Sequence, residues 1–245
     1  MFETTTAPSR FRNVLLALAC LAMGALGGWL VQWAGPGNRA QTEKVVHDYL
    51  MAHPEILPKA MQELQRRETA GQLSGIRADV ERAWPGQALG NPQGKVTLVE
   101  FTDFACTYCR HSVADIEAMI AADPELRVVI RQWPILAPES VDAARMGLAA
   151  AEQGKYAAFH KAMFAAGRPD AQTIAAAARA AGVDIARAEQ AMRQPKYEQE
   201  LARNSELARS LGFNGTPSWV VGDQILAGAV GKDKLTEAVA AAKGG

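Results

Sequence analysis

The apolar and polar positions divide the chain into an uncharged N-terminal stretch, a charged helical segment and a region of mixed strands and helices. Residues 14–34 carry no charged side chain, and Arg10 and Arg12 precede them. A stretch of that length and composition can cross a bilayer as a helix. Because the positive charges precede it, we expect a cytoplasmic N-terminus and a chain that lies outside the cytoplasm from about residue 38 onward.

Residues 1–37 are therefore predicted to form a cytoplasmic N-terminus and a transmembrane anchor. A cleaved signal peptide is the alternative, although the apolar stretch is longer than a typical signal core and no clean Ala-x-Ala site follows it. Cys20 follows Ala-Leu-Ala, but only about six apolar residues precede it, fewer than a signal core needs. We interpret Cys20 as an apolar residue of the helix.

Residues 38–88 predict a helical stalk or oligomerisation segment. The sequence Gly-Pro-Gly-Asn at 35–38 should end the first helix. Helical spacing follows over residues 41–83, where Pro54 and Pro58 should separate or kink two helices.

The last part of this segment, residues 65–82, is highly charged. Its apolar stripe consists of Leu73, Ile76 and Val80. We expect this stripe to be too sparse to be buried in a monomeric core, so the segment is a stalk, an oligomer contact or a solvated spacer.

Residues 89–245 predict one domain with a mixed α/β sheet. The expected elements are a strand at 96–104, a helix at about 106–121, a strand at 126–133, about four Ala-rich helices over about 138–211, strands at 218–221 and 225–227, and a helix at 232–242. Gly222-Asp223 between the last two strands is a hairpin signal. The order indicates an α/β sheet with an inserted all-helical subdomain.

The charge composition argues against nucleic-acid binding. The chain has 26 basic and 26 acidic residues and no long run of Lys or Arg. It has three cysteines, too few for a scaffold held together by disulfides. We therefore expect protein or small-molecule partners.

Two of these cysteines, Cys106 and Cys109, form a Cys-x-x-Cys pair where a buried strand meets a helix. The free N–H groups and positive dipole at the start of a helix stabilise an anion, so the pKa of the Cys106 thiol should be lowered. Cys106 is then the nucleophile. Cys109, one turn later and less exposed, can attack the mixed disulfide and release the substrate.

Other interpretations of the pair are weaker. A structural zinc site requires four ligands, and His111 is the one candidate nearby. A c-type haem requires His directly after the second cysteine, where Arg110 stands. A structural disulfide would close so short a loop that it would stabilise little. We expect no metal and no prosthetic cofactor, the redox-active disulfide being sufficient.

A carboxylate, Glu100, lies within the apolar strand that precedes the pair. Burial should raise its pKa and make it a proton acceptor or relay for Cys109; a Glu facing water at a strand edge is the alternative. We expect Asp103 to be exposed. Thr107 and Tyr108, between the cysteines, should tune the redox equilibrium through hydrogen bonds that reach the Cys106 sulfur.

Thr216-Pro217 stands before the late strand. A Cys-x-x-Cys after a strand together with this Thr-Pro resembles the thioredoxin superfamily over residues 92–245. The resemblance implies that Pro217 is cis and lies beside the cysteines, and that the backbone of Thr216 meets a substrate peptide. The residues alone are compatible with either isomer. In the resembled family a buried acid occupies the spacing of Glu100.

The long helical insertion resembles the DsbA branch of that superfamily. Asp48-Tyr49-Leu50 and His53-Pro54-Glu55-Ile56-Leu57 further resemble the region before the domain in ScsC- and Com1-like members, where it can mediate oligomerisation. Those members include disulfide isomerases and oxidases, so the resemblance leaves the direction open.

We therefore expect a thiol-disulfide oxidoreductase at the bacterial inner membrane, with its catalytic domain in the periplasm, that forms or isomerises disulfides in proteins. Its partners would be cysteine-containing substrates, a membrane redox partner and, through residues 41–83, further copies of the chain. The alternatives are a dedicated reductase or copper-stress thiol protein, and a non-catalytic chaperone or scaffold.

Overall fold

The computed structural model describes residues 9–34 and 39–244. The breaker cluster predicted at 35–38 lies outside the described residues. The chain divides into two compact units, Met1–Gln62 and Glu63–Gly245, whereas the predicted limits lie at 37 and 88.

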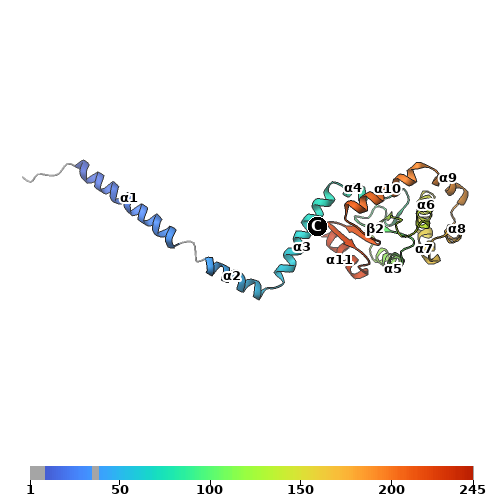
Figure 1. Ribbon diagram of the computed structural model, residues 1–245, viewed down its shortest axis with the longest axis horizontal. Helices are drawn as coiled ribbons and strands as arrows, with labels where there is room; N and C mark the ends of the chain where they lie inside the picture. Colours follow the sequence, from blue (N-terminus) through green and yellow to red (C-terminus); the bar gives the residue numbers. More distant parts are fainter. Residues whose placement is uncertain (1–8, 35–38, 245) are drawn as a thin grey trace, which may run out of the picture. The chain divides into compact units, whose positions relative to one another are not determined.

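The described residues of the first unit lie mainly in helices (Figure 1). They are α1 (Ser9–Ala34), α2 (Arg39–Ala52) and the beginning of α3 (Ile56–Ser74). Pro54 lies in the break between α2 and α3 and Pro58 in the first turn of α3, where a missing N–H costs no helical hydrogen bond.

Within the described part of the chain, no helix was found that is both long and apolar enough to cross a membrane. The structure therefore does not confirm the anchor predicted at 14–34. The side chains of residues 28 and 30–34, which belong to that predicted span, lie outside those described.

The second unit contains a five-stranded sheet with the order β1-β3-β2-β4-β5. The strands are β1 (Ala88–Gly90), β2 (Val96–Thr102), β3 (Leu126–Gln132), β4 (Ser218–Val221) and β5 (Gln224–Ala227). β2 and β3 are parallel, and the other pairs are antiparallel, so the predicted mixed sheet is confirmed. β1 was not predicted, because three residues between two turns are too short to show an alternating pattern.

This unit also contains helices, some of which cover the sheet. They are α4 (Arg77–Val80), α5 (Thr107–Ala122), α6 (Glu139–Glu152), α7 (Tyr156–Ala166), α8 (Ala171–Ala180), α9 (Ile185–Met192), α10 (Pro195–Ser210) and α11 (Lys232–Lys243). The run from α6 to α10 stands between β3 and β4, which confirms the inserted helical subdomain.

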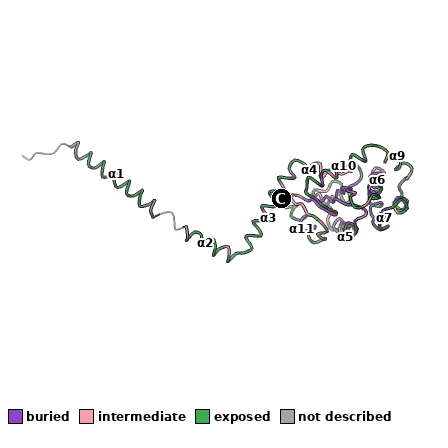
Figure 2. The backbone as a smooth tube through the Cα atoms, in the orientation of Figure 1, coloured by how far each residue is buried: buried purple, intermediate pink, exposed green. Residues whose placement is uncertain are grey.

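Alternate residues of the strands belong to different cores. Leu98 and Ile130 pack with the apolar side of α5 and α11, whereas Val99 and Val129 pack with residues of α3, α4 and α10. This alternation follows from the two-residue period of a strand. Figure 2 shows the buried residues concentrated in this unit, and the exposed residues of α2 and of the coloured part of α1.

The expectation that Leu73 and Val80 cannot be buried is wrong. Both are 0% exposed and pack against Val99, Phe101 and Val129 of the sheet. The segment has few apolar residues because only one narrow side of it contacts the sheet. Its charged side faces water. Residues 63–88 therefore belong to the compact unit of the catalytic pair.

A buried arginine joins this segment to the sheet. Arg131 of β3 is 1% exposed and donates to the carbonyl oxygen of Val80 at 3.2 Å, to Glu200 at 2.7 Å and to Asn204 at 2.9 Å. A buried guanidinium needs such partners to offset its lost hydration. The contacts fix α4 and α10 against β3.

Candidate active site

Cys106 is the N-cap residue of α5. Its backbone is extended, and its sulfur accepts a hydrogen bond from the backbone N–H of Cys109 at 3.3 Å. On the other side, its thiol donates to the carbonyl oxygen of Thr216 at 3.3 Å. Both cysteines are free thiols and both are buried, 3% and 1% exposed. The Cys106 sulfur therefore contacts both Cys109 and the backbone of Thr216.

The surroundings favour the thiolate of Cys106. A hydrogen bond from the Cys109 thiol, helped by the backbone N–H groups of Tyr108 and Cys109, lowers the pKa of Cys106 to about 6, although burial opposes this shift. The pKa is lowered in the predicted direction, but the Cys109 thiol contributes more to this than the backbone N–H groups at the helix start.

Cys109 has the opposite character. Burial raises the pKa of its thiol well above the usual value, and the hydrogen bond to Cys106 and the charge of Glu100 raise it further. Cys109 therefore keeps its proton at neutral pH, and it needs a proton acceptor before it can attack a disulfide.

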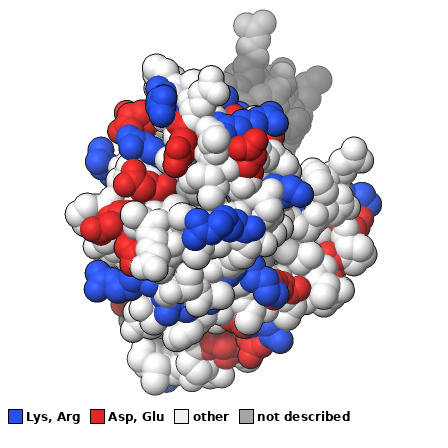
Figure 3. All heavy atoms as spheres, turned by 90° about the vertical axis from the view of Figure 1, so that its right-hand side faces the viewer, with Lys and Arg blue, Asp and Glu red and all other residues white. Residues whose placement is uncertain are grey.

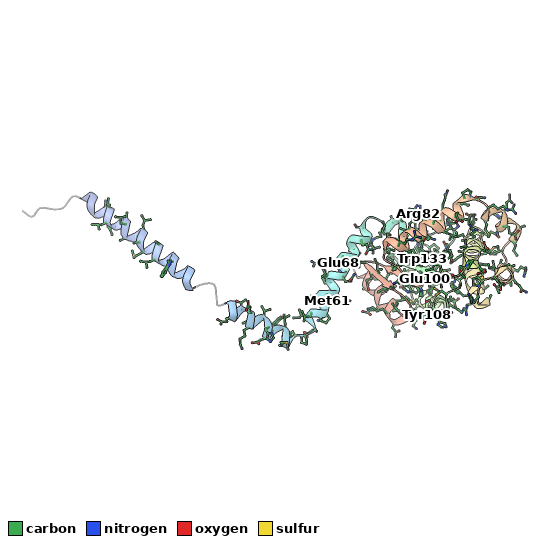
Figure 4. All side chains as sticks on the ribbon, in the orientation of Figure 1. Met61, Glu68, Arg82, Glu100, Tyr108 and Trp133 are labelled. Atoms are coloured by element: carbon green, nitrogen blue, oxygen red, sulfur yellow. The ribbon has the colours of Figure 1, made fainter. Side chains whose placement is uncertain are left out.

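The predicted burial of Glu100 is confirmed. The residue is 1% exposed, and its Oε1 has no hydrogen-bond partner. Burial raises its pKa well above the usual value, and the charge of Cys106 adds to this. Figure 4 shows Glu100 inside the body of the second unit and Tyr108, a residue of α5, nearer its edge.

The Thr216-Pro217 peptide bond is cis, as the resemblance implies. It precedes β4, which pairs with β2, so the sheet itself brings the Thr216 carbonyl to the start of α5.

Asp103 is buried, and the expectation that it is exposed is wrong. The residue is 1% exposed, and its carboxylate accepts the backbone N–H of Ala105, Ile135 and Leu136, each at 2.8 Å. The carboxylate therefore joins the loop before Cys106 to the loop after β3. The three N–H groups give the buried carboxylate the hydrogen bonds that water would otherwise supply.

Thr107 and Tyr108 lie on the surface, and Tyr108 is 63% exposed. His111 is also exposed. His160 is 3% exposed and packs against the rings of Phe104 and Phe164, where burial lowers its pKa to about 4. It is a structural histidine of the core.

Neighbours of the site that sequence reasoning missed include Gln132, at the end of β3, and Tyr156, at the start of α7. They are buried on the side of the sheet that carries Glu100. Nothing local to either residue signals this, because both reach the site through the fold.

In the described ranges, 9–34 and 39–244, no cluster of three or more His, Cys, Asp or Glu could hold a metal ion. Acidic and basic side chains are interspersed on the face shown in Figure 3, without a patch of one sign.

Two family models match the chain. That of the DSBA-like thioredoxin domain matches residues 97–240. That of the copper resistance protein ScsC N-terminal domain matches residues 39–70.

Several solved structures share the fold. A thioredoxin-like oxidoreductase from Silicibacter pomeroyi is 43% identical, with 64% of this chain and 92% of that chain covered and a TM-score of 0.62. A periplasmic thioredoxin-like protein from Salmonella enterica is 27% identical (69% and 97% covered, TM-score 0.63). The catalytic domain of Proteus mirabilis ScsC is 25% identical (71% and 98% covered, TM-score 0.65).

The curated relatives are of another kind. Na(+)/H(+) antiporters NhaA from Herminiimonas arsenicoxydans and Mycolicibacterium gilvum are 28% and 30% identical over 64% and 63% of this chain. The chain spans about a quarter of the length of these relatives (25% and 26%).

Proposed function

The chain belongs to the DsbA-like thioredoxin domain family, a family of thiol-disulfide oxidoreductases, and from this we propose that it exchanges thiols and disulfides with cysteine-containing proteins through Cys106 and Cys109. The observation that carries the proposal is the contrast between the two buried thiols, one favoured as a thiolate and one held protonated.

In the first step, the Cys106 thiolate attacks a substrate disulfide. A Cys106–substrate S–S bond forms, the substrate S–S bond breaks, and the second substrate sulfur leaves as a thiolate. The Thr216 carbonyl, already at the sulfur, lies where it can meet the substrate backbone.

In the second step, Glu100 accepts the proton of Cys109. The Cys109 sulfur then attacks the Cys106 sulfur, the Cys106–Cys109 disulfide forms, and the substrate sulfur is released. Two electrons have passed from the dithiol to the substrate. The reverse sequence oxidises a substrate dithiol, and a thiol or disulfide protein of the opposite redox state restores the starting form.

The test measures the reduction of a protein disulfide by the reduced protein. We expect Cys106→Ser to abolish turnover and Glu100→Gln to slow the second step by about 100-fold. Normal turnover by Cys106→Ser would contradict the proposal and favour a chaperone or scaffold. The equilibrium constant between the Cys106–Cys109 disulfide and glutathione then assigns the direction of exchange. A strongly oxidising cysteine pair indicates an oxidase, and a reducing pair indicates an isomerase or reductase.

Copper handling is the second candidate, because residues 39–70 match a domain named for copper resistance. Soft thiolates suit Cu(I), and the two cysteines lie side by side. Stoichiometric Cu(I) binding that requires both cysteines would support it, and equal binding by the Cys106→Ser variant would contradict it.

Association of several copies is proposed for α2 and the beginning of α3. Their large apolar side chains are exposed: Val45, Val46, Tyr49, Met51, Leu57 and Met61. Light scattering of the purified protein, with Tyr49→Ser and Met61→Ser as variants, tests this. A monomeric wild-type protein would contradict it.

We also propose that the catalytic unit lies outside the cytoplasm, held by an anchor at residues 14–34. The support is the charge pattern of the sequence and the similarity to a protein described as periplasmic. Protease accessibility in spheroplasts tests the location.

A further inference from the structure

The loop between β3 and α6, residues 133–138, lies beside the loop that carries Cys106. β2 and β3 are parallel neighbours, so their carboxyl ends meet at one edge of the sheet. Cys106 follows β2 at this edge, and the 133–138 loop follows β3. The backbone N–H of Trp133 donates to the carbonyl oxygen of Thr102 at 2.8 Å, which holds the two chains together beyond the paired strands. The loop and the reactive sulfur therefore share one edge of the sheet, the edge at which parallel strands commonly bind ligands.

Asp103 connects the two loops. One oxygen of its carboxylate accepts the backbone N–H groups of Ile135 and Leu136, and the other accepts that of Ala105, each at 2.8 Å. Its own carbonyl oxygen accepts the N–H of Cys106 at 2.9 Å. Removing a partner from a buried carboxylate is costly, so these bonds hold firmly. Asp103 therefore fixes the backbone of both loop residues relative to Cys106.

This fixed backbone presents two exposed apolar side chains. Ile135 is 44% exposed and Leu136 is 52% exposed. Among the described residues of the second unit, the other exposed large apolar side chains are Leu64 and Tyr108. Tyr108 is the second residue after Cys106. Large apolar side chains gathered in the open beside a reactive sulfur indicate a surface that binds a partner.

The order of the strands places this loop and the Thr216 carbonyl on opposite sides of Cys106. The order is β3-β2-β4, so the 133–138 loop lies on one side of the junction between β2 and α5, and Thr216-Pro217, which precedes β4, lies on the other. A polypeptide joined to the Cys106 sulfur continues on both sides of its own cysteine. One part can meet the Thr216 carbonyl, 3.3 Å from that sulfur, and the other can meet the loop.

We propose that Asp103 is a positioning residue: it holds Ile135 and Leu136 where they bind a large apolar residue next to the substrate cysteine. The inference rests on the proposed function and names a substrate preference of the same site. The occupant is the substrate polypeptide, because the reaction itself places its cysteine on the Cys106 sulfur. Asp103 transfers no proton and no electron.

The test compares two short peptides that are identical except for Leu or Ser on both sides of a single cysteine. Each cysteine forms a mixed disulfide with 2-nitro-5-thiobenzoate. The reduced full chain, with Cys20→Ser, attacks through Cys106: the Cys106–peptide S–S bond forms, and the coloured 2-nitro-5-thiobenzoate leaves as a thiolate. Below saturation we expect the Leu peptide to react about tenfold faster than the Ser peptide, the order of the effect of burying one apolar side chain.

Variants then assign this ratio of rates to its residues. The double variant Ile135→Ser, Leu136→Ser should bring the ratio close to one, whereas Leu64→Ser, on α3 and 58% exposed, is the matched control and should keep the wild-type ratio. Asp103→Ala leaves the loop N–H groups without their acceptor and should also bring the ratio close to one. Asp103→Asn keeps one side-chain oxygen and should recover part of it. A purely structural role for Asp103 would slow both peptides in the same proportion.

The outcomes separate the possible failures. A wild-type ratio near one, or an unchanged ratio in the double variant, overturns the apolar contact. An unchanged ratio in Asp103→Ala overturns the positioning role, and if that variant does not fold, an unchanged ratio in Asp103→Asn does so. If the reduced wild type releases 2-nitro-5-thiobenzoate from neither peptide, the proposed function itself is overturned.

Discussion

At the scale of single residues, the two thiols differ in what surrounds them rather than in their chemistry. A pKa of about 6 makes Cys106 largely thiolate at neutral pH. With Cys20→Ser as background, we expect its rate of alkylation by iodoacetamide to rise through an inflection near pH 6 while Cys109 remains unreactive. Cys109→Ala removes the hydrogen bond that lowers the pKa of Cys106 most, so the inflection in Cys106 alkylation should move to higher pH in this variant. An inflection that stays near 6 in this variant would assign the effect to the helix start alone.

Glu100 links the same site to stability. Because its folded pKa is raised, the carboxyl stabilises the fold fully below its unfolded value of about 4.5, and this contribution is lost as the pH rises through the folded value. A difference of one between the folded and unfolded pKa corresponds to about 1.4 kcal/mol. The free energy of unfolding of Glu100→Gln should therefore exceed that of the wild type by an amount that grows from pH 4 to pH 8, as measured by urea titration.

Single residues could be predicted where their signal is local. Cys106 lies three residues from its partner at a strand-to-helix junction, and Glu100 stands out in an apolar strand. Asp103 could not be predicted, because the N–H groups of Ile135 and Leu136 that permit its burial come from a loop more than thirty residues later.

At the scale of elements, the turn before β1 depends on one glycine. Gly86 has a φ of +78°, and a Cβ there would collide with the backbone of Ala151 at the end of α6. Gly154 has a φ of +67° but open space around it. Gly154→Ala should cost about 1 kcal/mol of unfolding free energy, the cost of the left-handed conformation, and Gly86→Ala about 3 kcal/mol or more, because backbone must also move. If urea titration gave the same loss of unfolding free energy for both variants, the turn at Gly86 would be free to shift away from Ala151.

Elements with many apolar residues were predictable and short ones were not. β2, β3 and the β4–β5 hairpin follow from runs of Val, Ile and aromatic residues. β1 forms because Ala88 and Leu89 meet the free edge of β3, which is a property of the sheet and not of those residues.

At the scale of the whole molecule, the catalytic unit begins at Glu63 rather than at residue 89. A fragment of residues 63–245 should fold and exchange disulfides. A fragment of residues 89–245 lacks Leu73 and Val80, which are 0% exposed, and it also leaves Arg131 without its Val80 partner. Losing two large buried side chains costs about 4 kcal/mol or more. Thermal unfolding monitored by circular dichroism compares the two, and equal melting temperatures would contradict the assignment.

The sequence could not predict that boundary, because the stripe of Leu73 and Val80 becomes a core only against Val99 and Val129. A helix that touches a sheet along one narrow side has the same apolar pattern as a solvated spacer. Which of the two forms depends on residues far along the chain.

The pairing of Glu100 with Trp219 has an optical consequence. The indole is 1% exposed, directly opposite Glu100 on β4, and its N–H is fixed on the carbonyl oxygen of Gly228 at 3.0 Å. An indole's emission depends on nearby charge, and this ring cannot turn away from it. With the other tryptophans replaced by phenylalanine, the fluorescence of Trp219 would report in real time, and without an added label, each gain and loss of the Glu100 proton during a redox cycle.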